Sequence, residues 1–265
     1  NSSLSQHYYS KIMWTKTVAI ILGISNLLMV PTDGHFFWLN VDKATGEIEV
    51  TFSEKAGVLD GAIKILEEKI QDRFALFAMS LGEGEGKRPT RKSIDWHLED
   101  ERIVGAIADY DPSSSSIIVS GHLDFGPFSE YGIDVDDLQY HFFSDQLLSK
   151  NTPMKIPAHE HMREKPFYVE LVGCNSEIAA TIHGLSTSID EAPLSICFYE
   201  LGGQEIACQD VEAKDDDAAV AKISTSLEIT TTIFAKVHAT FPSEGGKGSR
   251  KYATVSDNYE PQCSY

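Results

Sequence analysis

Short runs of alternating apolar and polar residues dominate the chain from residue 35 onward, and this period of two predicts β-strands. Residues 35–41 and 46–53 predict a hairpin with its turn at residues 44–46, because aromatic and β-branched side chains fill both runs. Residues 59–71 place apolar side chains three or four positions apart, which predicts one amphipathic helix. Further strands are expected at residues 74–81, 93–98, 102–110, 116–125 and 138–147.

A charged stretch with two prolines at residues 150–166 has no period and predicts a linker between two domains. Short strands resume beyond it, at residues 167–172, 178–183, 194–199, 205–208, 220–225, 229–240 and 252–255. Such short strands with frequent turns are typical of an immunoglobulin-like or transthyretin-like sandwich. The sequence therefore predicts a mainly β fold with two β-sandwich-like domains, at residues 35–149 and 167–265, and one amphipathic helix in the first.

Residues 1–34 have the order of a signal peptide preceded by upstream residues. Met13 and Lys16 precede an apolar run at residues 18–30, and a polar, turn-prone exit follows at residues 31–34. The apolar run is short and is interrupted by polar residues, so it does not predict a permanent membrane span. We expect cleavage after Gly34, which leaves His35 as the first residue of a secreted or periplasmic protein.

The charge balance restricts the class of partner. The 265 residues include 40 acidic and 22 basic side chains, for a formal net charge of -18. A nucleic acid is therefore not an expected partner, because phosphate contacts require clustered Lys and Arg. The hydrophobic fraction of 42% is enough for buried cores and argues for a globular chain.

Four cysteines lie in the second half of the chain, and none belongs to a C-x-x-C pair. Disulfides are the expected state of an exported chain. A two-residue turn at Gly202 and Gly203 sets Cys197 opposite Cys208 as a hydrogen-bonded pair, with Cα atoms about 5.5 Å apart. Cys174 and Cys263 then form the remaining pair.

Histidines are the candidate metal ligands. Cleavage before His35 would place a free amine beside its imidazole, and this pair chelates Cu(II) and, less tightly, Ni(II) or Zn(II). Such a site needs further donors, for which the chain offers His122, His141, His159 and His161. The sequence does not show which of these donors lies near His35.

Each candidate also has an ordinary structural interpretation. His35 would begin a strand whose aromatic neighbours supply the packing, and His159 and His161 would lie in an exposed polar linker. His122 and Asp124 share one face of a predicted strand, and their alternative role is an ordinary strand end before a turn. The chain has no G-x-S-x-G, H-E-x-x-H or Cys/His nucleophile motif, so the sequence does not support an enzyme.

The order of these motifs resembles a family of exported bacterial proteins known as the periplasmic component of cobalt/nickel uptake systems. A His-aromatic opening at residues 35–39 is followed by Phe-Ser-Glu at residues 52–54 and by a Gly- and aromatic-containing segment at residues 120–131. Residues 184–203 are similar to the lead-in, strand and turn of carboxypeptidase-regulatory-like domains. The usual Asn-Gly-Lys-Pro-Leu lead-in reads Asp-Glu-Ala-Pro-Leu at residues 190–194, and the resemblance carries over only His35 as a candidate ligand.

Three functions follow as hypotheses. The leading one is a secreted or periplasmic binding protein for nickel, cobalt or copper, in which His35 takes part in uptake or buffering. The second is an extracellular adhesion or scaffold module that contacts a protein partner and binds no metal. The third is a copper oxygenase with an N-terminal histidine brace, which requires a second histidine beside His35.

Overall fold

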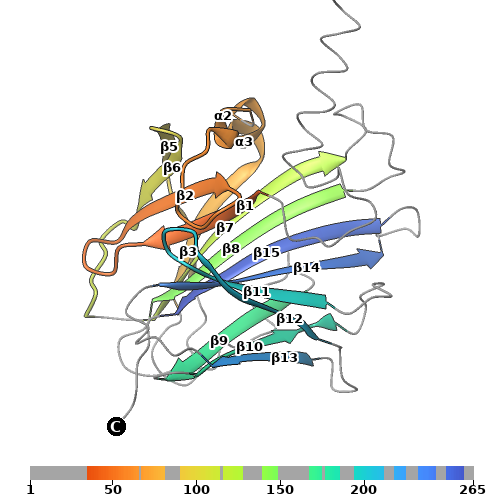
Figure 1. Ribbon diagram of the computed structural model, residues 1–265. Helices are drawn as coiled ribbons and strands as arrows, with labels where there is room; N and C mark the ends of the chain where they lie inside the picture. Colours follow the sequence, from red (N-terminus) through yellow and green to blue (C-terminus); the bar gives the residue numbers. More distant parts are fainter. Residues whose placement is uncertain are drawn as a thin grey trace, which may run out of the picture.

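The structure is a computed structural model, and the predicted mainly β fold is confirmed (Figure 1). It describes residues 35–65, 67–80, 90–113, 116–127, 139–148, 167–174, 177–185, 194–211, 218–224, 232–242 and 249–259. The predicted signal peptide and the predicted linker at residues 150–166 lie outside these ranges and remain predictions. Neither helix of the described ranges has the length and the apolar composition that a bilayer crossing requires.

The helical region lies where the sequence predicts it. Within the helix expected at residues 59–71 the structure has α2 (Ala62–Ile65) and α3 (Glu67–Arg73), and residue 66 between them lies outside the described residues. Asp60 begins the region, because its Oδ1 accepts a hydrogen bond from the Ala62 amide and so caps the first turn. Ile63 and Ile70 are buried, as the helical period predicts.

The strands form three sheets. The first is four-stranded, in the order β1 (Phe36–Val41), β2 (Glu47–Ser53), β6 (Arg102–Ala106) and β5 (Trp96–Glu99). The second is three-stranded, in the order β13 (Ala218–Ser224), β10 (Glu177–His183) and β9 (Tyr168–Cys174). The third is eight-stranded, in the order β12 (Glu205–Val211), β11 (Leu194–Glu200), β14 (Ile233–Pro242), β15 (Ser249–Tyr259), β8 (Gln139–Leu148), β7 (Ile117–Pro127), β3 (Phe74–Ser80) and β4 (Thr90–Ser93).

The eight-stranded sheet draws on both predicted domains. β15 from the second half of the chain pairs in parallel with β8 from the first half. One continuous sheet thus runs across the predicted domain boundary. The two buried hydrophobic clusters, in contrast to the sheet, follow the predicted boundary. One is built mostly from residues before 149 and the other mostly from residues after 166. The division of the chain into two domains remains a prediction.

The eight-stranded sheet has a different cover on each face. Figure 1 shows the four-stranded sheet on one side and the three-stranded sheet on the other. Consecutive residues of β8 reach both sides, because side chains alternate along a strand. The ring of Phe142 contacts Phe37 of β1, with centroids 5.6 Å apart, whereas Phe143 packs in the cluster of Val169 and Ile178. We call these the β1 face and the β9 face of the eight-stranded sheet.

Side chains of β8 also form hydrogen bonds with backbone amides at the unpaired edge of β1. β1 is the first strand of its sheet, yet it is almost fully buried. The Leu39 amide donates to Ser144 Oγ at 3.1 Å, and the Val41 amide donates to Gln146 Oε1 at 2.6 Å. Polar side chains thus replace the missing neighbouring strand, because a buried backbone amide needs a partner.

Candidate functional site

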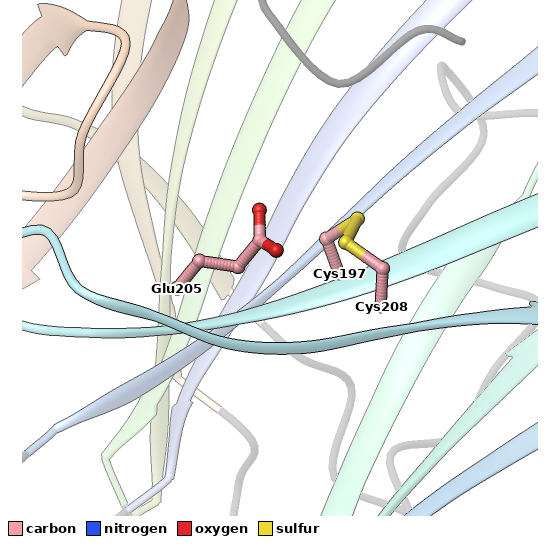
Figure 2. A group of neighbouring side chains, drawn as sticks. All are labelled: Cys197, Glu205 and Cys208. Carbon is pink, nitrogen blue, oxygen red and sulfur yellow. A yellow bond between two sulfur atoms is a disulfide. The ribbon is translucent and has the colours of Figure 1, made fainter.

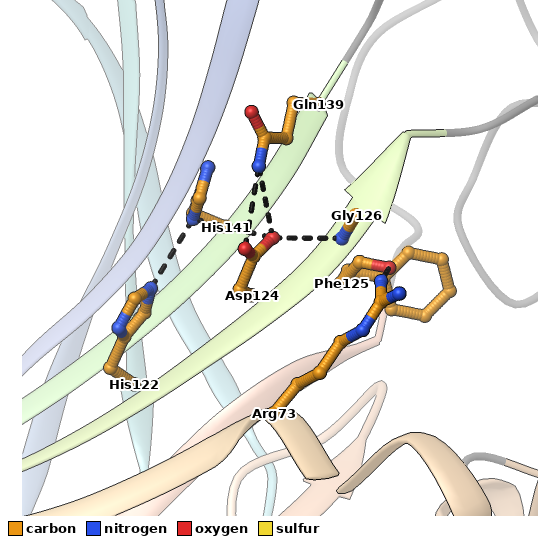
Figure 3. Close-up of polar contacts among 7 residues, drawn as sticks. All are labelled: Arg73, His122, Asp124, Phe125, Gly126, Gln139 and His141. Atoms are coloured by element: carbon orange, nitrogen blue, oxygen red, sulfur yellow. Dashed lines mark hydrogen bonds and ion pairs between the residues drawn. The ribbon is translucent and has the colours of Figure 1, made fainter.

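Three of the polar residues singled out by their sequence positions meet on the β9 face of the eight-stranded sheet. His122 and Asp124 lie two residues apart on β7, so both side chains point to the same face. β8 runs antiparallel beside β7, and His141 is paired directly with Asp124. Figure 3 shows the His122, Asp124 and His141 side chains together on these two strands. The structure therefore joins two of the predicted metal ligands and a carboxylate.

The distances within this cluster are short. His122 Nε2 lies 3.2 Å from His141 Nδ1, and His141 Nδ1 lies 3.8 Å from Asp124 Oδ1. The 3.2 Å contact is a hydrogen bond between the two rings. The ring whose facing nitrogen carries a hydrogen donates it to the nitrogen of the other ring. His141 is buried and His122 is half-buried, so solvent reaches the cluster from one side.

Surrounding groups hold the carboxylate and one imidazole in place. Asp124 Oδ1 accepts a hydrogen bond from the Gly126 amide at 2.9 Å, and Gln139 Nε2 donates to Oδ1 at 3.2 Å and to Oδ2 at 3.3 Å (Figure 3). The His122 ring stacks on Phe143, with centroids 4.4 Å apart and planes 7° apart. The cluster thus has the supporting hydrogen bonds and packing that orient ligands in metal sites.

The spacing of the two nitrogens suits a shared metal ion. Two nitrogen ligands at about 2.0–2.1 Å from a tetrahedral ion lie roughly 3.3 Å apart. His122 Nε2 and His141 Nδ1 are already 3.2 Å apart, so an ion could take the place of the shared proton with little movement. Asp124, whose Oδ1 lies 3.8 Å from His141 Nδ1, could complete a two-nitrogen, one-oxygen set.

His35 lies in a different environment. Its Nε2 is 3.0 Å from Asp60 Oδ2, and its ring is 5.4 Å from the ring of Phe52. Asp60 also caps α2 and accepts a hydrogen bond from the Glu54 amide. The His35–Asp60 pair therefore joins the start of β1 to the start of the helical region. This contact agrees with the structural interpretation of His35 as the first residue of a packed strand.

The eight-stranded sheet separates His35 from His122 and His141. The strand that follows His35 packs against the β1 face, whereas the two histidines project from the β9 face. The histidine brace requires a second histidine beside His35, and the structure does not bring His122 or His141 there. His159 and His161 lie outside the described residues.

The Cys197–Cys208 disulfide is confirmed, with the two cysteines paired across β11 and β12. The predicted two-residue turn is wrong, because the Glu200 amide donates to the Gln204 carbonyl and leaves three residues in the loop. A one-residue bulge at Ile206 then restores the predicted pairing of the cysteines. The two Cα atoms are 4.0 Å apart, nearer to a non-hydrogen-bonded pair than to the expected hydrogen-bonded one. The second predicted pair involves Cys263, which is outside the described residues.

Two further groups could not be identified from the sequence. Asp60 reaches His35 only because β2 and the helical region fold back onto the start of β1. Lys236 is 2% exposed, and its ammonium lies 4.0 Å from the centre of the Phe36 ring. The alternating pattern of β14 does not predict which residue Lys236 contacts. Both contacts join residues that are far apart in the sequence, and no local pattern encodes them.

Comparison with known proteins does not assign the chain to a family. No family profile matches the sequence, and no curated protein matches it. Among solved structures, the chain matches part of a pullulanase from Anoxybacillus sp. LM18-11, crystallised with maltotriose, at 7% sequence identity and a TM-score of 0.22, which is too low to show a shared fold. The match covers 81% of this chain and 25% of that protein, so the chain corresponds to about a quarter of its length.

Proposed function

We propose that this is an exported protein that binds a divalent transition metal, nickel, cobalt or copper, through His122 and His141, with Asp124 as a third ligand. The observation that carries the proposal is the 3.2 Å separation of His122 Nε2 and His141 Nδ1 on neighbouring strands. Uptake or buffering fits a site that holds the ion on a rigid sheet surface. His35 with its free amine remains a second candidate ligand pair at a separate place.

Two properties of the chain support this proposal. An excess of 40 acidic over 22 basic residues attracts cations towards the surface, although it does not select among them. The Cys197–Cys208 disulfide is typical of proteins that fold in an oxidising compartment, which supports export. Imidazole donors favour nickel and copper over magnesium and calcium, which prefer oxygen ligands.

Calorimetric titration with Ni(II), Co(II) and Cu(II) tests the site. The chain that begins at His35 is compared with the variants His122→Ala and Asp124→Asn. We expect the affinity to fall more than tenfold in His122→Ala, because loss of a supporting partner alone costs about 10–100-fold. His97→Ala is the matched control, since His97 is exposed on β5 and pairs with Glu99, away from the cluster.

A third variant carries one extra residue before His35 and so removes the amine from that position. Equal affinity in this variant, together with a loss in His122→Ala, would assign binding to the β9 face. Equal affinity of the wild type, His122→Ala and His97→Ala would refute the proposed site. Absence of binding by the wild type would refute metal binding and favour the adhesion or scaffold function.

A further inference from the structure

The bulge in β12 places a carboxylate beside the disulfide. Tyr199 is paired with Glu205, Phe198 with Ala207 and Cys197 with Cys208, so Ile206 is the extra residue. In a regular strand, residues 205 and 208 would point to opposite faces, because they are an odd number of positions apart. The bulge adds one residue between them and brings Glu205 and Cys208 to the same face.

Three potential metal ligands meet as a result. A carboxylate oxygen of Glu205 and the sulfur atoms of Cys197 and Cys208 all lie within 4.8 Å of one another (Figure 2). While the disulfide is intact, the two sulfur atoms are bonded to each other and do not act as thiolate ligands. The group can therefore hold a metal ion only after reduction.

The surroundings of the disulfide favour its reduction from one side. Cys208 is exposed, whereas Cys197 is 3% exposed, so an attacking thiolate reaches the Cys208 sulfur. Cys197 lies in the buried cluster and is the leaving group in this attack.

We propose that reduction by a small dithiol converts Cys197, Cys208 and Glu205 into a binding site for a borderline or soft divalent cation such as Zn²⁺. The dithiol sulfur bonds to Cys208 as the disulfide bond breaks, and the electron pair of that bond passes to Cys197. The second sulfur of the dithiol then displaces Cys208, so the dithiol is oxidised to a disulfide while the protein gains two electrons and two protons.

Metal binding follows with a small rearrangement. The ion replaces the protons of the two thiols, which are released, and Glu205 adds a carboxylate oxygen. Two sulfur ligands of a tetrahedral zinc ion lie about 3.8 Å apart, a separation that rotation about the two Cα–Cβ bonds can supply. The site lies on β11 and β12 and is independent of His122 and His141.

The test uses the full chain, reduced with a dithiol that is then removed without oxygen, and Co²⁺ as the probe. Thiolate ligands give Co²⁺ a charge-transfer absorption band that histidine and carboxylate ligands do not give. We expect the band in the reduced chain and not in the oxidised one. All chains carry Cys174→Ser and Cys263→Ser, so that no other thiol gives the band. In this background Cys197→Ser/Cys208→Ser should lose the band, and a band that persists there would overturn the proposal.

Glu205→Gln tests the carboxylate without touching the thiols. We expect its Co²⁺ affinity to fall about tenfold or more. Glu47→Gln is the matched control, since Glu47 is an exposed residue of β2. Equal affinities in the two variants would overturn the proposal. Circular dichroism of the reduced chain accompanies the titration, and loss of the β spectrum would also overturn it, because an unfolded hairpin cannot hold Glu205 beside the sulfurs.

Discussion

The buried amides of β1 give the sharpest test of how the two sheets are held together. Gln146 is 2% exposed, and its Oε1 accepts the Val41 amide at 2.6 Å. Gln146→Leu keeps the size and burial of the side chain but removes this acceptor. The Val41 amide would then be buried without its partner. A buried donor left unsatisfied costs about 1–3 kcal/mol, so the free energy of unfolding should fall by that amount.

Urea unfolding followed by tryptophan fluorescence measures this loss. Trp38 on β1 is 1% exposed, so its emission reports on separation of the sheets. The midpoint should fall while the slope stays unchanged, because the surface exposed on unfolding is the same. Gln71→Leu is the matched control: Gln71 is exposed on α3, and its replacement should change the free energy by less than about 0.5 kcal/mol. Equal midpoints for Gln146→Leu and the wild type would refute the role of Gln146 at this edge.

Two further predictions concern the hairpin loop and a buried phenol. Gly203→Ala should destabilise the chain by at least about 1 kcal/mol more than Gly202→Ala: both glycines have positive φ, but only at Gly203 would a Cβ lie 2.6 Å from Lys55 Cβ. Equal urea midpoints would contradict the clash. Burial raises the pKa of Tyr140 well above its ordinary value of 10.0, so the unfolded chain loses this proton first and stability should fall as the pH rises above 10. Tyr140→Phe should show a shallower fall in urea midpoints measured across that pH range, and an unchanged slope would contradict this cause.

The strands could be predicted because their signal is local. The expected strand at residues 35–41 corresponds to β1 (Phe36–Val41), and the expected strand at residues 178–183 corresponds to β10 (Glu177–His183). Cys197 and Cys208 could be paired because only 11 positions separate them. The parallel pairing of β15 with β8 could not be predicted, since alternation shows which residues share a face but not which strand lies alongside.

The candidate sites depend on register, which the sequence pattern leaves open. His122 and His141 were both expected to be available as ligands, yet their contact requires β7 and β8 to pair with Asp124 opposite His141. His35 and Asp60 meet through the folding of the helical region back onto β1. A shift of one residue in the pairing of β7 with β8 would move one of the two histidines to the other face and abolish their contact.

A bulge lies beside each of these sites, and neither bulge can be found by counting along a strand. In β7 the register shifts between Asp124 and Gly126, and the Gly126 amide donates to the Asp124 carboxylate beside His141. In β12 the extra residue turns Glu205 to the side of Cys208. An alternating pattern therefore predicts the faces of side chains only up to the first bulge. In β12 the extra residue stands between the carboxylate and the cysteine, so deleting Ile206 would turn Glu205 away from Cys208 while the strand itself remained.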